Sequence, residues 1–315
     1  MIRYRAFQNF DPPALAEIWR TQPPLPGRVQ AVTPPLLEKY VFAKPWFDRH
    51  GLIVAIEGAR PVGFVHAGFG ATGDHRDIDT REGTICQLMV APHEQRGVIA
   101  VELLGAAEDY LRRRGAQHVH AGCQFPLNPF YLGLYGGSQT PGVLDSDKQM
   151  VELLADSGFR PTRPRSLWRR SLAGFQAPVD RQWMQVRRRF VAAQPIETLP
   201  DNWWDACVWA QFDWNRHDLT LPGGGEPVIS ATLWDIEPLS RSWGRQTAGL
   251  VRLDDTPQAR NEGLTGFLLG ETMRMCQSQG YAQFEAQTGP DDDSLAQLLA
   301  RLGFEQYDQA ALWSK

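Results

Sequence analysis

The chain has 315 residues, a length that suits two domains of ordinary size, each able to bury its own core. Hydrophobic residues make up 43% of it, charged residues 22%, and the net charge is −4, which is typical of a globular protein and gives no reason to expect a nucleic acid partner. The four cysteines are widely spaced and no apolar run approaches a membrane span of ~20 residues, so we expect a cytoplasmic protein with reduced thiols, no metal site and no membrane association.

The first half alternates between strand patterns of period two and helix patterns of period 3.6. From residue 99, for example, apolar residues recur at helical spacing until Gly115 ends the run. The predicted elements, in chain order, are a strand at 2–7, a helix beginning at Asp11, a loop at 21–35, a hairpin with strands at 52–56 and 62–66, an irregular segment at 71–82, a strand at 84–90, a helix at 99–115, a strand at 118–123, a helix at 148–156 and a strand at 167–172.

The second half repeats this order less regularly. The predicted elements are a strand at 184–192, a helix capped by Asp201, a loop at 222–227, antiparallel strands at 228–234 and 246–253, a helix from residue 264, a strand at 282–288, a helix at 294–302 and a strand at 309–314. Residues 173–180 are the expected linker, so the predicted domains are 1–174 and 175–315. The first half carries about 20 extra residues, which contribute to a long aromatic and glycine-rich loop near 125–147, a type of loop that is often functional.

Two loops of similar sequence each precede an amphipathic helix. The first loop contains Gln95, Arg96, Gly97, Val98, Ile99 and Ala100, and the second contains Arg260, Asn261, Glu262, Gly263, Leu264 and Thr265. Each follows a proline by three residues and is followed downstream by a Gly-Phe pair. Glycine allows a close approach of the backbone, and unpaired N–H groups at a helix N-terminus attract anions. Two copies therefore indicate an internal duplication built around anion binding, as for a cofactor with a nucleotide tail.

This order of strand, loop, helix, strand, helix and strand resembles the GCN5-related N-acetyltransferase (GNAT) family, in two tandem copies over most of the chain. The resemblance implies an α/β (α+β) fold, with a mixed, mostly antiparallel sheet flanked by helices in each domain. It also implies that acetyl-CoA or another acyl-CoA is the co-substrate, with its pyrophosphate at the loop and its pantetheine arm along the preceding strand. That strand would present Leu88, Met89 and Val90 in the first copy, and residues from Leu253 to Asp255 in the second.

The two copies depart from the family pattern in different ways. In the first copy Val98 stands where glycine is usual, and Gly97 lies one place earlier. In the second copy Arg260 and Gly263 fit, and the hydroxyl of Thr265 could donate to phosphate. The loop sequences thus favour the second copy, whereas the long loop that could shape a substrate site belongs to the first. Which copy binds or catalyses stays open, and a composite site is also possible.

Many members of the family place a tyrosine five residues before the phenylalanine of the Gly-Phe pair, as the acid for the leaving thiolate. The corresponding positions here are Leu154 and Leu299, so the acid or base must come from elsewhere. His118 and His120, on one face of a strand, are candidates, although a structural histidine is the more common case. The other candidates are Tyr131 and Tyr135 in the long loop, which could equally cover the core, and Glu285 in the second half, for which a solvated strand position is the more common case.

The sequence therefore predicts an N-acyltransferase that moves an acyl group, most often acetyl, from acyl-CoA to an amine. The alternative is an inactive acyl-CoA sensor or interaction module, because both copies lack the tyrosine. A small-molecule or peptide amine is the expected partner. The protein would be either a monomer whose halves pack like a dimer or a homodimer.

Overall fold

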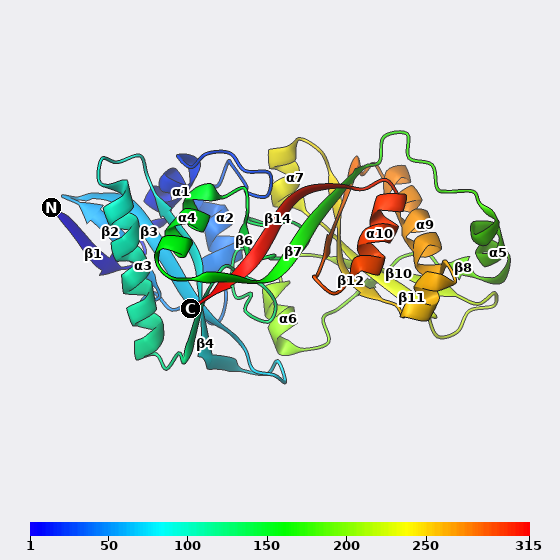
Figure 1. Cartoon of the computed structure of the whole chain (residues 1–315), viewed down its shortest axis with the longest axis horizontal. Coiled ribbons are helices and arrows are strands. Elements are labelled where there is room, and N and C mark those ends of the chain that lie inside the picture. The colour runs from blue at the N-terminus through cyan, green and yellow to red at the C-terminus, as the bar shows by residue number, and fades with distance from the viewer.

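The computed structural model describes all residues from 1 to 315, as two halves that lie side by side in an elongated molecule (Figure 1). The first half contains β1 (Ile2–Ala6), α1 (Pro12–Arg20), α2 (Pro34–Leu37), the π-helical turn η1 (Glu38–Phe42), β2 (Leu52–Glu57), β3 (Arg60–Ala71), β4 (Ile78–Val90), α3 (Arg96–Arg113), β5 (His118–Ala121), β6 (Val143–Leu144), α4 (Lys148–Asp156) and β7 (Arg160–Ser171). The second half contains α5 (Arg181–Arg189), β8 (Val191–Ala192), β9 (Ile196–Thr198), α6 (Trp203–Val208), β10 (Trp214–Thr220), β11 (Ile229–Asp235), α7 (Glu237–Trp243), β12 (Thr247–Asp254), α8 (Pro257–Asn261), α9 (Leu264–Ser278), β13 (Gln283–Thr288), α10 (Asp293–Arg301) and β14 (Glu305–Ser314).

All strands belong to one mixed sheet that runs through both halves. Its order is β1-β2-β3-β4-β5-β14-β7-β13-β12-β11-β10-β8, with β6 paired to β14 and β9 paired to β10. Antiparallel pairs dominate, and a parallel pair occurs once in each half, as β4 with β5 and β12 with β13. This mixed α/β architecture confirms the predicted fold class.

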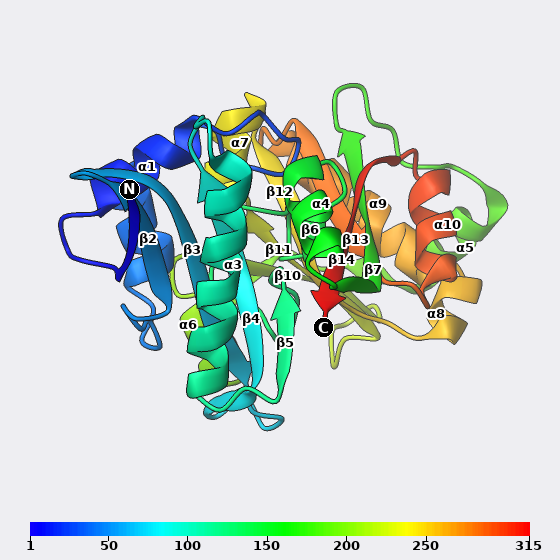
Figure 2. The same cartoon turned by 60° about the vertical axis from the view of Figure 1, so that its left-hand side comes forward.

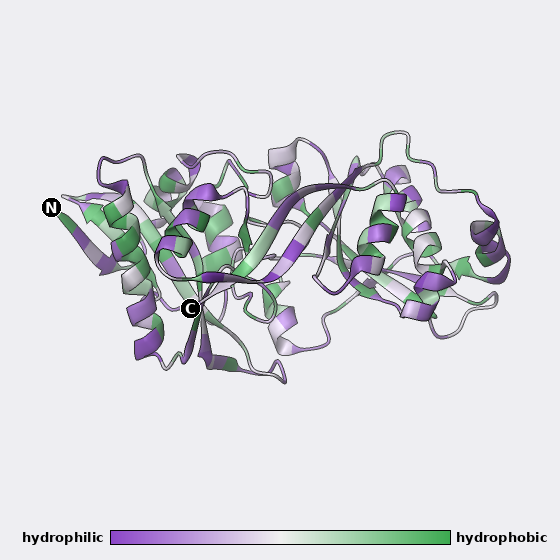
Figure 3. Ribbon diagram, in the orientation of Figure 1, coloured by the Kyte–Doolittle hydropathy of each residue, from purple (hydrophilic) through white to green (hydrophobic).

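The halves exchange strands at the centre of the sheet. β14, the last strand of the chain, lies between β5 and β7, while β7 of the first half pairs with β13 of the second. The sequence of β14 suits this position, because its first part is hydrophilic and its last part, residues 310–313, is hydrophobic and buried where it meets the first half (Figure 3). Its backbone is therefore shared by the two halves, and their relative position is fixed by strand pairing.

Helices cover both faces of the first-half sheet. Ile53 and Ala55 of β2 point to a core formed with α3 and α4, and the alternate residues Leu52 and Val54 point to a core formed with α1. α3 and α4 lie on the same face of the sheet (Figure 2). On this face the start of α3 and the start of α4 lie close to the end of β4, where the candidate site lies.

Several predicted elements are wrong, each for a local reason. The predicted strand at 184–192 is mostly helix α5, whose start is capped by Asp180 accepting from the Trp183 N–H at 2.8 Å. Trp183 and Val186 are buried at helical spacing, so the basic residues after them lie in the last helical turn rather than across a strand. The segment at 71–82 is not irregular throughout, because β4 begins at Ile78. Strand β10 and helix α7 were missed, and α6 is capped by Asn202 rather than Asp201.

Candidate functional site

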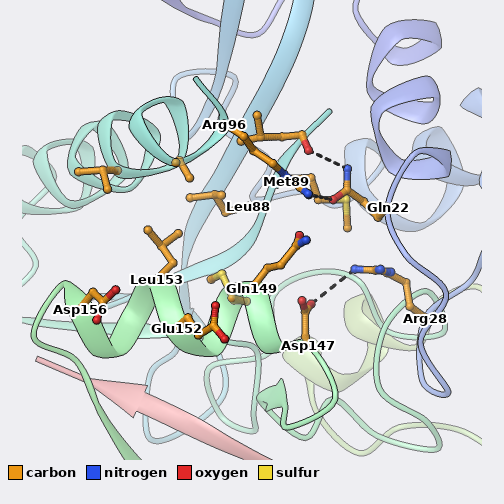
Figure 4. A pocket seen from close by; sticks show the side chains of 15 residues that line it. Gln22, Arg28, Leu88, Met89, Arg96, Asp147, Gln149, Glu152, Leu153 and Asp156 are labelled. Atoms are coloured by element: carbon orange, nitrogen blue, oxygen red, sulfur yellow. Dashed lines mark hydrogen bonds and ion pairs between the residues drawn. The ribbon is translucent and has the colours of Figure 1, made fainter. Parts of the chain in front are cut away.

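A pocket of about 420 Å³ lies in the first half between the end of β4, the start of α3 and α4 (Figure 4). β4 contributes the residues from Leu88 to Val90, α3 contributes Arg96, Gly97 and Ala100, and α4 contributes Leu153. The pocket thus brings together the strand and the first loop that the sequence analysis singled out. The polar side chains Gln22, Arg28 and Asp147 line the same cavity.

One edge of the end of β4 has no neighbouring strand at this pocket. β5 pairs with β4 only as far as Ile85, opposite Ala121. The Ala91 N–H donates to the Val62 carbonyl of the strand on the other side, at 2.9 Å. Because peptide groups alternate along a strand, those of Leu88 and Val90 point to the open edge, where the Val90 carbonyl accepts from the Gln22 amide at 3.1 Å. The Leu88 peptide groups and the Val90 N–H can therefore pair with an extended ligand as a neighbouring strand would.

The start of α3 presents free N–H groups to solvent. Neither the Gly97 nor the Val98 N–H has a hydrogen-bond partner, and Gln95, the N-cap residue, makes no side-chain cap. Gly97 has open space around the position of a Cβ atom, and the Val98 side chain is 63% exposed. The branched side chain of Val98 therefore leaves the helix end open, and Ile99 points away into the core. An N-terminus of this kind suits a phosphate group.

The second loop is closed by side chains of its own half. Arg260 pairs with Asp255 at 2.7 Å and also with Asp292, while the Thr265 hydroxyl donates to Asp255 at 2.7 Å. Gly263 has a left-handed conformation with φ of 78°, and a Cβ atom there would meet the Gln182 side chain of α5 at 2.6 Å. The donors that the sequence assigned to phosphate are thus bonded to carboxylates.

The remaining predicted residues of the second copy are not gathered into an open cavity either. The Asn261 carbonyl accepts from Gln182 at 2.9 Å, and Glu262 accepts from Gln258 at 2.8 Å. Leu264 is buried in the core, and Leu253 lies beside it, partly buried. The loop sequences favoured the second copy, but the open pocket lies at the first.

The gap between β12 and β13 is filled by part of the long loop of the first half. These strands pair only as far as Gly249 opposite Glu285. Beyond that pair, residues 137–140 (the inserted segment) lie between the two strands. The Ser138 N–H donates to Glu285 at 2.6 Å, and the Gln139 side chain donates to the Val251 carbonyl of β12, also at 2.6 Å. The inserted segment thus occupies the place in the second half that corresponds to the open edge of β4.

Known proteins share the fold of this chain. Residues 13–136 match the model of the acetyltransferase (GNAT) family. A tandem GNAT protein from the clavulanic acid biosynthesis pathway, solved without AcCoA, is 14% identical with a TM-score of 0.64, and the match covers 100% of this chain and 98% of that one. The first half thus matches the GNAT family model, and the whole chain shares the fold of a tandem GNAT protein.

Other solved GNAT structures share the fold over the whole chain. A GCN5-related N-acetyltransferase from Sphaerobacter thermophilus is 14% identical with a TM-score of 0.63, and 95% of it is covered. A GCN5-related glucosamine N-acetyltransferase region of a fungal multi-domain GH3 beta-N-acetylglucosaminidase is 15% identical with a TM-score of 0.67, and this chain spans 38% of that one. No curated protein matches the sequence. None of the helices has both the length and the apolar character needed to cross a membrane.

The pocket is lined by three acidic residues that were not among the predicted site residues, Asp147, Glu152 and Asp156. Asp147, the N-cap residue of α4, lines the pocket with 15% of its side chain exposed. It accepts a hydrogen bond from the Tyr135 hydroxyl at 3.2 Å and lies 3.5 Å from the Arg28 guanidinium. Burial raises the pKa of the Asp147 carboxyl, and burial also raises the pKa of Tyr135 well above its ordinary value. The tyrosine therefore stays protonated and donates to Asp147.

Of the four catalytic candidates from the sequence, only the Tyr135 side chain is hydrogen-bonded to a residue that lines the pocket. Tyr131 is buried and its hydroxyl lies 3.0 Å from Nδ1 of His66. His120 is bonded to Glu82 and to Ser314, each at 2.8 Å. These contacts give Tyr131 and His120 structural partners away from the cavity. His118, the other histidine of that strand, is exposed and also bonded to Glu82.

Glu285 is fully buried in the second half. Besides Ser138, its carboxylate accepts from the Tyr307 hydroxyl at 3.2 Å and from the Gln287 amide at 3.4 Å. Burial raises its pKa above the ordinary value of 4.5. Its contacts are with the inserted segment and with its own sheet, which is a different location from the pocket of the first half.

The two positions where a family tyrosine is common are core positions in this chain. Leu154 and Leu299 are both fully buried, in the cores that pack under α4 and α10. Asp147 could have been suspected from the sequence as the polar residue at the start of the helix at 148–156. Arg28 gave no such signal, because it lies in an irregular segment 119 positions before its partner.

Proposed function

We propose that the first half binds an acyl-CoA and transfers its acyl group, most often acetyl, to an amine. The open edge of β4 supports this, because the peptide groups of Leu88 and the Val90 N–H can pair with the amide groups of the pantetheine arm. The N–H groups of Gly97 and Val98, with Arg96 beside them, suit the pyrophosphate. The coincidence of both features in one pocket is the observation that carries the proposal.

The second half serves as a scaffold in this proposal. Its loop donors are already bonded to Asp255, and its strand gap holds the inserted segment. An acyl-CoA would have to break several of these buried hydrogen bonds to bind there, and each would cost free energy. One acyl-CoA per chain is therefore expected.

The reaction proceeds by direct attack of a neutral amine on the thioester. A strand N–H of β4 at the open edge polarises the thioester carbonyl. As the C–N bond forms, the nitrogen gives up a proton to Asp147, and the C–S bond breaks to release coenzyme A as a thiolate. The thiolate then takes a proton from the same carboxyl or from water. The raised pKa of Asp147 suits it to both transfers.

The test is the release of free thiol from acetyl-CoA in the presence of a panel of amines, for the wild type and Asp147→Asn. We expect the variant to lower kcat by roughly 10²- to 10⁴-fold, the usual range for general base catalysis. The dissociation constant for acetyl-CoA should change little. Asp145→Asn, two positions away and outside the pocket, is the matched control and should keep its activity.

Two results would contradict this proposal. Binding of acetyl-CoA without turnover of any amine would favour the sensor alternative, which the missing tyrosine suggested. Equal kcat for the wild type and Asp147→Asn would show that Asp147 is not the base, even if acetyl transfer occurs.

A further inference from the structure

Arg28 is a buried cation held firmly at one end of the pocket. The segment that carries it is fixed by backbone hydrogen bonds to the long loop, from Val29 N–H to Leu134 O at 3.0 Å and from Gly136 N–H to Gly27 O at 2.7 Å. A Cβ atom on Gly27 would lie 2.5 Å from the Gly136 carbonyl oxygen, so the two segments pack in direct contact. The guanidinium is therefore held in place before any ligand binds.

The hydrogen bonds of Arg28 leave donors unused. Its side chain is only 4% exposed, yet it donates only to the Pro23 carbonyl and to Asp147. The Asp147 contact is 3.5 Å long, beyond the usual length of a charge-assisted hydrogen bond. Nε of Arg28 has no partner. A guanidinium has five N–H groups, so this buried cation can accept a further anion.

We propose that the acceptor is an amine that also carries a carboxylate, such as a small amino acid. This inference rests on the proposed function. The carboxylate binds Arg28, and the amine lies beside Asp147, where it loses its proton during attack. Because the two charged groups of the protein are only 3.5 Å apart, the carboxylate and the amine of the ligand are separated by one or two carbon atoms.

The shape of the guanidinium favours a carboxylate on Arg28. A carboxylate is planar and can accept two parallel N–H bonds from the guanidinium fork. Phosphate groups of acyl-CoA have their own donors at the start of α3, where Arg96 is bonded to Gln22 at 2.8 Å. In Figure 4 Arg28 and Asp147 point to each other at one end of the cavity, with Gln149 and Gln22 nearby. That end is thus polar and carries both signs of charge.

The test uses pairs of acceptors that differ only in the carboxylate, such as alanine with ethylamine and phenylalanine with 2-phenylethylamine. Thiol release from acetyl-CoA is measured for each member with the wild type. We expect kcat/KM to be roughly 10- to 100-fold higher for the carboxylated member of at least one pair, as for a hydrogen-bonded charge. Arg28→Gln should remove this difference, mainly through KM, and Arg28→Lys should restore part of it.

Two controls keep the result specific. Arg5→Gln removes the arginine of another Arg–Asp pair of the first half, outside this pocket, and should leave the preference unchanged. Calorimetric titration of acetyl-CoA into Arg28→Gln should give the dissociation constant of the wild type, which also shows that the variant is folded.

The outcomes separate this inference from the proposed function. Failure of the wild type to bind acetyl-CoA would refute the proposed function itself. Binding with equal kcat/KM for both members of every pair would refute only the carboxylate preference, whereas binding with no turnover of any amine would refute the proposed transfer as well. A loss of acetyl-CoA affinity in Arg28→Gln equal to its loss in kcat/KM would show that Arg28 binds the cofactor instead.

Discussion

Substitution of Glu285 separates a structural role from a catalytic one. Its carboxylate is fully buried and receives the Ser138 N–H at 2.6 Å and the Tyr307 hydroxyl at 3.2 Å. The Arg169 guanidinium lies 3.9 Å from the centre of the Tyr307 ring, and its Nε and Nη2 have no hydrogen-bond partner. Removal of the Glu285 carboxylate would leave both the Ser138 N–H and the charge of Arg169 uncompensated.

The size of the effect follows from these contacts. Loss of one member of a buried charged network costs about 3–5 kcal/mol, so Glu285→Ala should lower the free energy of unfolding by that amount. Glu285→Gln keeps the shape and one acceptor but loses the charge, and should cost about 1.5–3 kcal/mol. The assay is urea unfolding followed by tryptophan fluorescence, since the Trp234 indole donates to the Ser138 carbonyl at 3.0 Å. Thiol release by the folded fraction is measured in parallel.

The two roles give opposite results for Glu285→Gln. If Glu285 holds the inserted segment, stability falls and the turnover rate per folded molecule changes by less than about tenfold. If Glu285 is instead the general base, turnover slows by roughly 100-fold or more while stability is kept. That second result would refute this account and support the catalytic role that the sequence suggested.

Two further predictions concern buried ionisable groups. Burial lowers the pKa of His66 to about 3, so between pH 6.5 and 3 the unfolded chain binds a proton that the folded chain does not. The free energy of unfolding should therefore fall by about 1.4 kcal/mol per pH unit as the pH drops through this window. In urea titrations His66→Gln should flatten that slope, and an unchanged slope would contradict the lowered pKa. The Lys44 ammonium donates to the Cys207 and Val208 carbonyls at the end of α6, both at 2.7 Å. Lys44→Met should therefore lower the free energy of unfolding by about 1.5–3 kcal/mol. A change under about 0.5 kcal/mol would show that this contact between the halves is not stabilising.

Local patterns in the sequence were sufficient to predict most helices and the duplicated fold. The run from residue 99 has the spacing of a helix, and α3 covers it. The exchange of β14 could not be predicted, because its partners in β5 and β7 are chosen by tertiary packing rather than by local spacing.

The ranking of the two loops also required the structure. A loop sequence shows which residues could face an anion, but not which carboxylates already occupy them. Arg260 fits the family pattern, yet Asp292, from a distant segment, is among its partners. Val98 departs from the pattern, yet its side chain points to solvent. The pairing of Arg28 with Asp147 across 119 positions lies equally beyond local reasoning.

Calorimetric titration of acetyl-CoA into the wild type, Gly97→Asp, Gly105→Asp and Arg260→Ala shows whether the open pocket of the first half binds the cofactor. Gly97 and Gly105 both lie in α3 with open space around a Cβ atom, so both variants should fold, but only Gly97→Asp places a negative charge at the free N–H groups. We expect one acetyl-CoA per chain, affinity reduced roughly tenfold or more by Gly97→Asp, and no change in the other two variants. Affinity that is lost in Arg260→Ala and kept in Gly97→Asp would place the cofactor in the second half and contradict the account.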